Sequence, residues 1–445
     1  MSRYSRKSMI VLLCCIAATM NTVSLQAYPL DGADASGIRR LHGYAAQQKT
    51  AGPKLAKGAL LNTSDIRLAL LGASFEKDFD QQPKQEQLQK ALESIFKTRD
   101  PSYSIVVVDI SDPAQIAWAA INPDTKQQAG SVGKMITLAG LFNSLAKAFP
   151  KIEDRQRVLR DTMVTAGEWV IADEHKVPFY ESDTNSNRFA VPMPSDQFTL
   201  FEWMDHVASA SSNAAGSVVW REAMLLHQFG ARYPLTESEA NDFFKTSKGS
   251  TLQALSLSVS NEPLQAVGIP EKSMRQGSFW TRTGKRKVPG VESYASPREL
   301  ARYIVRMEQG LLVDEWSSLE IKKLMYMTKR RYRYVYSPEL HQSAVYFKSG
   351  SLYQCVAEEG YRCAKYAGNK RNLMNSVAVI ESLPGADKPY RYIAVLMSNV
   401  LKVNSAWDHA SLGAAIHKVI LTRSTATVES GASAKQMYDA GKSED

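Results

Sequence analysis

The sequence predicts an α+β fold, in which an antiparallel sheet is flanked by helices and carries an inserted all-helical subdomain. Strand-like segments occur early in the chain, within residues 103–121, and again late, within residues 344–398. The stretch between them, residues 151–290, is polar and helix-like. If the early and late strands form one sheet, the helical middle packs beside it, and a ligand site is expected at the junction.

The first residues have the features of an export signal. Basic residues precede an apolar run, residues 9–18, and small residues follow at positions 24–27. This order is typical of a secretory signal peptide, so we expect removal of residues 1–27 and export to the periplasm. The apolar run is short for a bilayer span, and no stable membrane span is expected after processing. An uncleaved N-terminal anchor is the alternative reading.

The charge distribution, the spacing of the histidines and the cysteine positions indicate which partners and cofactors to expect. The net charge of +9 is not gathered in a dense basic stripe, so the sequence does not predict nucleic-acid binding. The seven histidines lack metal-ligand spacing, and neither a metal nor another cofactor is expected. Cys355 and Cys363 lie outside the predicted signal peptide, and in an exported protein they most simply form one disulfide. Two free thiols are the alternative.

The mature chain begins with a segment that we expect to be an N-terminal extension, residues 28–82. Apolar residues at helical spacing then predict an amphipathic helix over residues 83–97. β-branched and apolar residues predict a buried strand over residues 103–110 and its hairpin partner over residues 115–121. The main domain is therefore expected to start at residue 83.

The next segment, residues 130–145, predicts a helix that is apolar on nearly every side and therefore buried. Its first turn nevertheless carries a hydroxyl at Ser131 and an amine at Lys134. Side chains three residues apart on a helix share one face. Burial can lower the pKa of a lysine, and a neutral amine can take the proton of a serine that attacks a carbonyl. Ser131 and Lys134 are therefore a candidate nucleophile and base.

The remaining segments complete the pattern. Two expected helices, residues 199–208 and 214–229, flank a short break. Late in the chain, strand composition occurs over residues 344–348, 352–357, 376–382 and 390–398, before a closing helix over residues 405–421. The expected division is an α/β subdomain of residues 83–150 and 291–423, a helical subdomain of residues 151–290, and a disordered tail of residues 424–445.

Three short motifs occur along the chain in a fixed order. They are Ser131-x-x-Lys134, Ser211-Ser212-Asn213 and Lys348-Ser349-Gly350. The second lies in the break between two helices and the third ends a predicted strand, and this order and placement are specific. Over residues 83–423 the chain resembles the penicillin-recognising serine enzymes, the superfamily of class A β-lactamases and penicillin-binding proteins. The resemblance implies the β-lactamase/transpeptidase-like version of the α+β fold.

The resemblance also implies a role for each motif residue. Ser131 would attack a lactam or peptide carbonyl and form an acyl-enzyme, while Lys134 would accept or relay its proton. Ser211 would pass a proton to the leaving nitrogen, and Asn213 would hold the side-chain amide of the substrate. The third motif would bind the substrate carboxylate through Lys348 and Ser349, with Gly350 beside them. The backbone N–H groups of Ser131 and Ser351 would form the oxyanion hole.

One motif of class A β-lactamases is not found intact, the Glu-x-x-Leu-Asn loop whose glutamate activates the hydrolytic water. Glu237 heads the nearest match, with alanine in place of leucine, but it also lies in a predicted helix-capping box. The leading interpretation is an exported serine hydrolase of β-lactams. The second is a D-alanyl-D-alanine carboxypeptidase or transpeptidase that acts on peptidoglycan stem peptides. The third is a non-catalytic module that binds penicillin or peptidoglycan.

Overall fold

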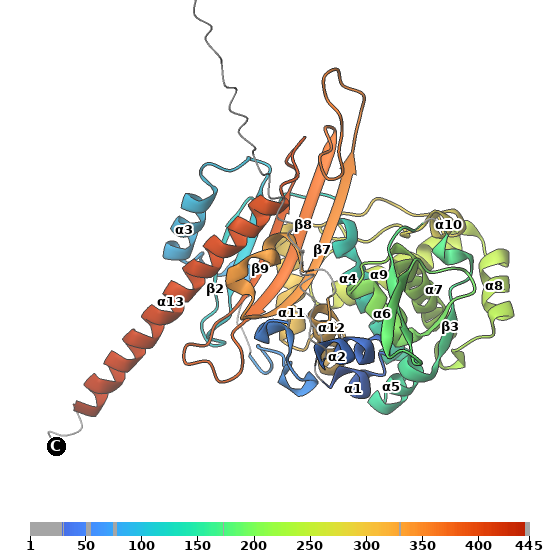
Figure 1. Cartoon of the computed structure of the whole chain (residues 1–445), viewed down its shortest axis with the longest axis horizontal. Helices are drawn as coiled ribbons and strands as arrows, with labels where there is room; N and C mark the ends of the chain where they lie inside the picture. The colour runs from blue at the N-terminus through green and yellow to red at the C-terminus, as the bar shows by residue number, and fades with distance from the viewer. Residues whose placement is uncertain are drawn as a thin grey trace, which may run out of the picture.

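The computed structural model describes residues 29, 31–49, 55–73, 78–171, 173–328 and 331–440, and a five-stranded antiparallel sheet lies at its centre (Figure 1). The strands lie in the order β2-β1-β9-β8-β7. Their bounds are β1 Ser104–Asp109, β2 Ala117–Ile121, β7 Ala344–Gln354, β8 Arg371–Glu381 and β9 Arg391–Ser398. Because β1 pairs with both β2 and β9, the early and late strands share one sheet, and this prediction is confirmed. The predicted signal peptide, residues 1–27, lies outside the described residues.

Helices form most of the remaining structure. The two helices predicted before and after the first two strands, over residues 83–97 and 130–145, are among them. The α-helices are α1 Gly32–Ser36, α2 Arg40–Lys49, α3 Glu86–Phe96, α4 Lys134–Ala148, α5 Ile152–Asp161, α6 Leu200–Ala208, α7 Asn213–Phe229, α8 Glu237–Thr246, α9 Gly249–Ala266, α10 Arg282–Lys287, α11 Pro297–Glu308, α12 Glu315–Tyr326 and α13 Ala406–Ala440. The 3-10 helices are η1 Lys57–Ala59, η2 Thr63–Asp65, η3 Phe79–Gln81, η4 Gly130–Gly133, η5 Gly167–Val170, η6 Gly230–Arg232, η7 Arg333–Tyr336 and η8 Pro338–Leu340.

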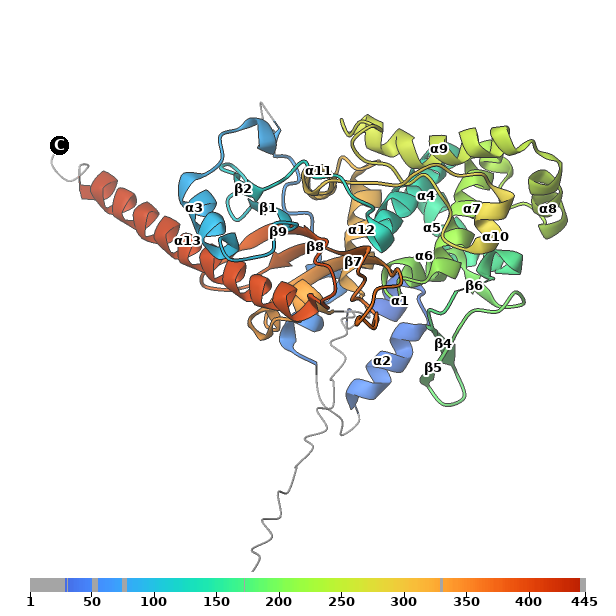
Figure 2. The same ribbon diagram turned by 90° about the horizontal axis from the view of Figure 1, so that it is seen from above.

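The two faces of the sheet pack against different helices, because successive side chains of a strand point to opposite faces. In β1, Ile105 and Val107 join one buried cluster, whereas Val106 and Val108 join the other. The first cluster includes apolar side chains of α3 and α13, which lie together on one side of the sheet in Figures 1 and 2. The second cluster includes α11 and α12 and continues into the helical part of the chain.

The predicted buried helix, α4, lies between the sheet and the helical part of the chain (Figure 2). It packs against α7 and α9 on the helical side, and its apolar side chains from Met135 to Leu145 are buried. Gly140 permits the close approach of α9, since a Cβ atom there would lie 2.6 Å from the carbonyl oxygen of Val259. The first turn of this helix therefore sits where the two parts of the fold meet.

Two short ribbons within the helical part were not predicted. They are β3 Met163–Thr165 paired with β6 Gln197–Thr199, and β4 Val177–Glu181 paired with β5 Ser186–Ala190. The second ribbon lies in the stretch of residues 151–290 that was expected to be helical. Its aromatic side chains have partners in the core, as the ring of Phe179 lies 4.9 Å from that of Phe198. Tertiary packing of these rings stabilises a pairing that the local polar sequence does not indicate.

The segment expected to be an N-terminal extension packs against the main body. Ile38 and Leu41 are fully or almost fully buried in its core, and α2 contacts the β4–β5 ribbon. Arg40 is 2% exposed and donates a hydrogen bond from Nη2 to Oδ1 of Asp205 at 2.6 Å. Asp205 lies in α6 and is itself fully buried. The charge of Asp205 therefore has its ion-pair partner in α2, far away in the sequence.

A second buried ion pair joins α11, α12 and β8. The amine of Lys322 lies 2.8 Å from Glu308 Oε2 and 2.6 Å from Glu381 Oε1, and it also donates to the carbonyl oxygen of Arg67. Lys322 and Glu308 are fully buried. Two buried carboxylates therefore share one fully buried cation, and an unpaired buried charge is strongly destabilising.

We expect Lys322→Met to lower the free energy of unfolding by about 3–5 kcal/mol, because it leaves two buried carboxylates without their cation. Urea denaturation followed by circular dichroism measures the loss. Lys323→Met is the matched control, since Lys323 pairs with Glu320 near the surface and such pairs contribute about 1 kcal/mol or less. Equal losses for the two variants would contradict this account.

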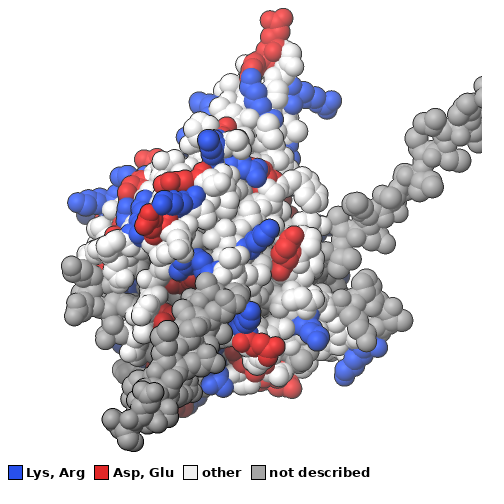
Figure 3. Space-filling model, turned by 90° about the vertical axis from the view of Figure 1, so that its left-hand side faces the viewer, with Lys and Arg blue, Asp and Glu red and all other residues white. Residues whose placement is uncertain are grey.

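Four further features bear on the remaining predictions. The strands expected over residues 344–348 and 352–357 are parts of one long strand, β7. The closing helix α13 runs to Ala440, past residue 424, where the tail was expected to begin. Within the described ranges, none of the helices is both long enough and apolar enough to cross a bilayer. On the face shown in Figure 3, basic and acidic side chains are intermixed, so the positive excess does not form one patch there.

Candidate active site

The candidate nucleophile Ser131 lies in the 3-10 turn η4, immediately before α4. Residues three apart are stacked in such a turn, and Lys134, the first residue of α4, therefore reaches back towards Ser131. Lys134 is fully buried, and its Nζ donates a hydrogen bond to Ser131 Oγ at 2.9 Å. The two residues of the first motif are thus in direct contact.

The amine of Lys134 also contacts the second motif. Its Nζ lies 2.7 Å from Asn213 Oδ1 and 2.9 Å from the backbone oxygen of Ser211. The indole ring of Trp280 lies against the same amine, with its centroid 4.6 Å from Nζ. These contacts fix the position of the amine beside Ser131 Oγ, and Trp280 is a contact that sequence reasoning missed.

The second motif lies in the break between α6 and α7, as predicted. Ser212 is the N-cap of α7, and its hydroxyl accepts a hydrogen bond from the backbone N–H of Ala215. Ser211 has a φ of +58°, a left-handed conformation that is uncommon for a residue other than glycine. Its hydroxyl accepts a hydrogen bond from Lys348 Nζ at 2.7 Å. Backbone strain at Ser211 is therefore associated with a link to the third motif.

The third motif lies on β7, where this strand passes η4. Lys348 is 2% exposed, and Ser349 Oγ lies 2.8 Å from the hydroxyl of Tyr332. Gly350 permits the contact with η4, since a Cβ atom there would lie 2.2 Å from the Ala129 oxygen and 3.0 Å from the Ser131 nitrogen. Gly130 also approaches β7 closely, because a Cβ atom there would lie 2.9 Å from the Ser351 nitrogen. The two backbone amides expected to form the oxyanion hole therefore lie at this crossing.

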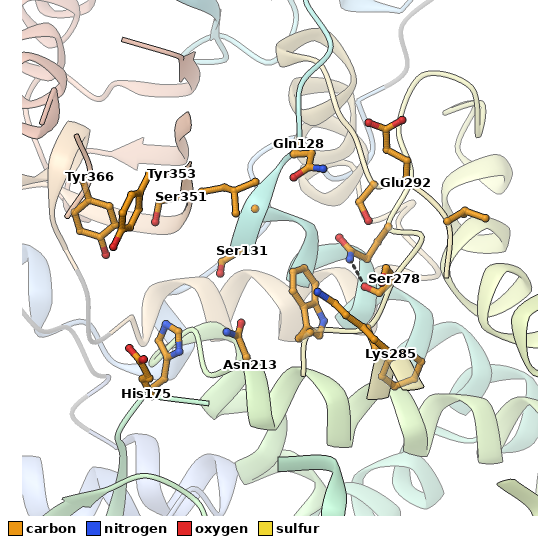
Figure 4. A pocket seen from close by; sticks show the side chains of 18 of the residues that line it. Gln128, Ser131, His175, Asn213, Ser278, Lys285, Glu292, Ser351, Tyr353 and Tyr366 are labelled. Carbon is orange, nitrogen blue, oxygen red and sulfur yellow. Dashed lines mark hydrogen bonds between the residues drawn. The ribbon is translucent and has the colours of Figure 1, made fainter. Parts of the chain in front are cut away.

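A cavity of about 740 Å³ opens above the crossing (Figure 4). Ser131, Asn213 and Ser351 line its centre, and Tyr353 and Tyr366 lie together on one side of Ser131. Ser278, Lys285 and Glu292 lie on the opposite side, on the segment that connects α9 to α11. The cavity is thus large enough for a small-molecule ligand and has the serine hydroxyl at its centre.

Sequence comparison decides the family. The model of the Beta-lactamase enzyme family (Beta-lactamase2) matches residues 86–367, more than half of the chain. The chain belongs to this family. No curated protein sequence matches it significantly.

Several solved structures are similar to this beta-lactamase family member at low sequence identity. A class A beta-lactamase from Bacteroides cellulosilyticus is 12% identical, with a TM-score of 0.50 over 77% of this chain and 100% of that chain. A beta-lactamase from Sphaerobacter thermophilus is 13% identical, with a TM-score of 0.45 over 76% and 95%. The penicillin G acyl-enzyme of a PBP-A mutant is 12% identical, with a TM-score of 0.46 over 75% and 96%. At these identities the first match supports the α+β fold and nothing finer.

Asp173 is a site residue of this family member that sequence reasoning missed. Its carboxylate is fully buried, and Oδ2 accepts hydrogen bonds from the Ser212 hydroxyl at 2.8 Å and from the Ala214 N–H at 2.9 Å. Its Oδ1 lies 2.6 Å from Nδ1 of His175. Asp173 therefore holds the residues on both sides of Asn213. One weak signal for this residue is present in the sequence, the charged triplet Asp173-Glu174-His175 within a polar segment.

The environment of Asp173 predicts a pH dependence of stability. Burial by itself raises the pKa of this carboxyl, but the hydrogen bond and charge of His175, with the bonds from Ala214 and Ser212, hold the pKa well below its usual range. A lowered pKa stabilises the fold above the unfolded-state pKa of about 3.9, and this stabilisation is lost as the pH falls towards the folded-state value. We expect Asp173→Asn to be less stable than the wild type at pH 7, with the difference shrinking below about pH 4.

Urea denaturation of both proteins at pH 7 and pH 3 measures this change. Asp183→Asn, at an exposed turn position, is the control and should be equally close to the wild type at both pH values. A difference between Asp173→Asn and the wild type that is constant across this range would contradict the account.

Glu237, the candidate deacylation base, lies elsewhere. It is exposed, it is the first residue of α8, and it lines a separate cavity with Thr162 and Asn241. The capping-box alternative describes the segment, because Thr236 and Glu239 form the reciprocal cap of α8. Glu237 is therefore not positioned to activate water at Ser131. The expectation failed because a helix start and the searched motif share the same residue types.

The predicted disulfide is present between Cys355 and Cys363, and it closes the hairpin that connects β7 to β8. This hairpin extends beyond the body of the molecule in Figure 1. Tyr353 lies on β7 just before the first cysteine, and Tyr366 lies three residues after the second; both line the cavity. The disulfide therefore limits the freedom of the segment that carries the aromatic side of the cavity. Among the described residues, no cluster of side chains has the composition of a metal site.

Proposed function

We propose that the chain is an exported serine hydrolase that forms an acyl-enzyme at Ser131 and hydrolyses the amide of a β-lactam. The observation that carries the proposal is the position of Lys134 Nζ, within hydrogen-bond distance of Ser131 Oγ, Asn213 Oδ1 and the Ser211 oxygen. A serine whose hydroxyl contacts a buried amine has a base within reach for the attack on a carbonyl.

In the proposed reaction, Ser131 Oγ attacks the lactam carbonyl and its proton passes to Lys134 Nζ. The backbone N–H groups of Ser131 and Ser351 stabilise the negative charge that develops on the carbonyl oxygen. Ser211, whose hydroxyl contacts Lys348, delivers a proton to the leaving nitrogen as the carbon–nitrogen bond breaks. Lys348 supplies the positive charge that attracts the substrate carboxylate.

Intact-protein mass spectrometry after mixing with benzylpenicillin, from seconds to hours, tests the proposal, with free drug followed by its absorbance. The expected result is a penicilloyl adduct that appears and then disappears while the drug is hydrolysed. No adduct at any time would overturn the proposed function.

A second candidate function is a D-alanyl-D-alanine carboxypeptidase or transpeptidase acting on peptidoglycan stem peptides. It is favoured by the composition of the cavity, whose described carboxylate residues are Glu174 and Glu292. In the described structure neither carboxylate is hydrogen-bonded to Ser131 Oγ, and Glu237 lies in another cavity. An adduct that persists for hours, together with release of D-alanine from a stem peptide, would support this alternative.

We further propose that the protein acts in the periplasm. The disulfide between Cys355 and Cys363 supports this location, because disulfides form and persist in oxidising compartments. Fractionation of producing cells, with an antibody against the protein, tests it. Recovery in the periplasmic fraction at a mass reduced by residues 1–27 is expected, and recovery of the full-length chain in the cytoplasm would contradict it.

A further inference from the structure

An aspartate–histidine pair lies at the cavity that Ser131 lines, and it has no part in the acylation steps above. Asp173 is fully buried, and both of its carboxylate oxygens are engaged, Oδ1 with His175 and Oδ2 with Ser212 and Ala214. The contact between Oδ1 and Nδ1 of His175 is 2.6 Å long. Because the carboxylate cannot turn, it fixes the orientation of the imidazole ring.

The ring of His175 faces the cavity of Ser131. Its side chain is 27% exposed, and it lines the cavity together with Ser131 and Asn213. In Figure 4 the ring lies beside Asn213, on the side of Ser131 away from Glu292. The position of His175 is tied to the second motif, because Asp173 also binds the two neighbours of Asn213.

The pairing sets the hydrogen-bonding role of each ring nitrogen. A carboxylate only accepts, so Nδ1 of His175 carries the proton that it donates to Asp173. In the neutral ring Nε2 is then the acceptor, and within the described structure Nε2 has no hydrogen-bond partner. The cavity therefore holds an oriented base that is available to a water molecule.

Each of the other charged side chains that line the cavity is a cation, lies across the cavity from Asn213, or has no hydrogen bond that orients it. Lys285 and Lys365 are cations and do not accept a proton, and Glu292 lies across the cavity from Asn213 (Figure 4). Glu174 lines the cavity, but its carboxylate has no hydrogen bond to a described residue that would orient it. His175 is the oriented acceptor among these groups.

We infer that His175, oriented by Asp173, is the general base that activates the hydrolytic water in breakdown of the Ser131 acyl-enzyme. The inference rests on the proposed acyl-enzyme and adds the step that follows it. The water oxygen bonds to the ester carbonyl carbon while one water proton moves to Nε2 of His175. The bond between that carbon and Ser131 Oγ then breaks, and the imidazolium returns the proton to Oγ. The products are the carboxylic acid and the free serine.

The test separates acylation from deacylation on one sample. Wild type, His175→Ala and Asp173→Asn are mixed with benzylpenicillin, and the adduct is followed by mass spectrometry during formation and after removal of free drug. We expect His175→Ala to form the adduct within about threefold of the wild-type rate and to lose it at least about 100-fold more slowly. Asp173 is a positioning residue, so Asp173→Asn should slow adduct loss by a smaller factor.

Rescue by a small molecule distinguishes a chemical role from a structural one. Free imidazole in the buffer should speed adduct loss in His175→Ala, because the cavity is open to solvent, and should leave the wild-type rate unchanged. His227→Ala is the control, since His227 lies near Glu262, away from this cavity, and should match the wild type throughout.

Either of two rate comparisons would overturn the inference while leaving the acyl-enzyme intact. One is loss of the adduct from His175→Ala at the wild-type rate, and the other is a wild-type adduct that persists as long as that of His175→Ala. Slow adduct loss that imidazole does not speed would assign His175 a structural role and would also overturn it. Absence of any adduct on the wild type would overturn the proposed function itself, and the assignment of His175 with it.

Discussion

Replacement of Ser131 by alanine is expected to abolish the penicilloyl adduct and to reduce β-lactam hydrolysis at least about 1,000-fold. The reason is chemical, since the change removes the hydroxyl that lies 2.9 Å from Lys134 Nζ. The change removes one oxygen atom from a half-buried residue, so the fold should be retained. Mass spectrometry and drug absorbance measure the two losses, and the thermal unfolding midpoint checks the fold.

Ser144→Ala is the matched control for this prediction. Ser144 lies on the same helix and heads a second Ser-x-x-Lys sequence that ends at Lys147. Its hydroxyl donates to the backbone oxygen of Gly140 and is buried away from the cavity. The variant should acylate at the wild-type rate. An adduct of equal amount on Ser131→Ala would show that another residue is the nucleophile.

Gly350→Ala is expected to slow acylation by about 100- to 1,000-fold, the usual effect of losing one oxyanion-hole donor. A Cβ atom at this position would lie 2.2 Å from the Ala129 oxygen, which is too short for any relaxed contact. Both neighbouring segments are backbone, so β7 and η4 must separate, and the N–H groups of Ser131 and Ser351 then move apart. Stopped-flow fluorescence with a fluorescent penicillin measures the acylation rate.

Gly360→Ala provides the comparison for that variant. Gly360 lies in the hairpin closed by the disulfide, and a Cβ atom there would meet nothing within 4 Å. Its φ of +74° makes alanine unfavourable by about 1 kcal/mol, so a small loss of stability is expected with acylation unchanged. If Gly350→Ala acylates as fast as Gly360→Ala, the close crossing of β7 and η4 is not required for the reaction.

The sheet and the three motifs could be predicted because their signals are local. Alternating or continuous apolar runs mark β1 and β9, and each motif is a triplet or quartet at the end of one element. The sequence order of the motifs then supplied the long-range information that periodicity lacks. The contact of Lys134 with Asn213, 79 residues apart, follows from that order.

The rest of the site depends on contacts that no local pattern reveals. Asp173 lies 39 residues before Ser212, in a loop whose composition is typical of an exposed segment, yet its carboxylate is fully buried. Trp280 lies in the connection between α9 and α11, and its indole ring packs against the amine of Lys134. Glu237 shows the opposite error, in which a local motif had the right residue types but belonged to a helix cap.

The ion pair between Arg40 and Asp205 has a consequence for how the molecule can be divided. The match to the family model starts at residue 86, and Arg40 lies before this shared region. Arg40 neutralises the buried carboxylate of Asp205 in α6, six residues before Ser211. A fragment trimmed to the shared region would keep the buried Asp205 and lose Arg40, the arginine that pairs with it. The region that matches the family model is therefore shorter than the part of the chain that forms the folded structure. The segment before residue 86 contributes to the stability of the fold.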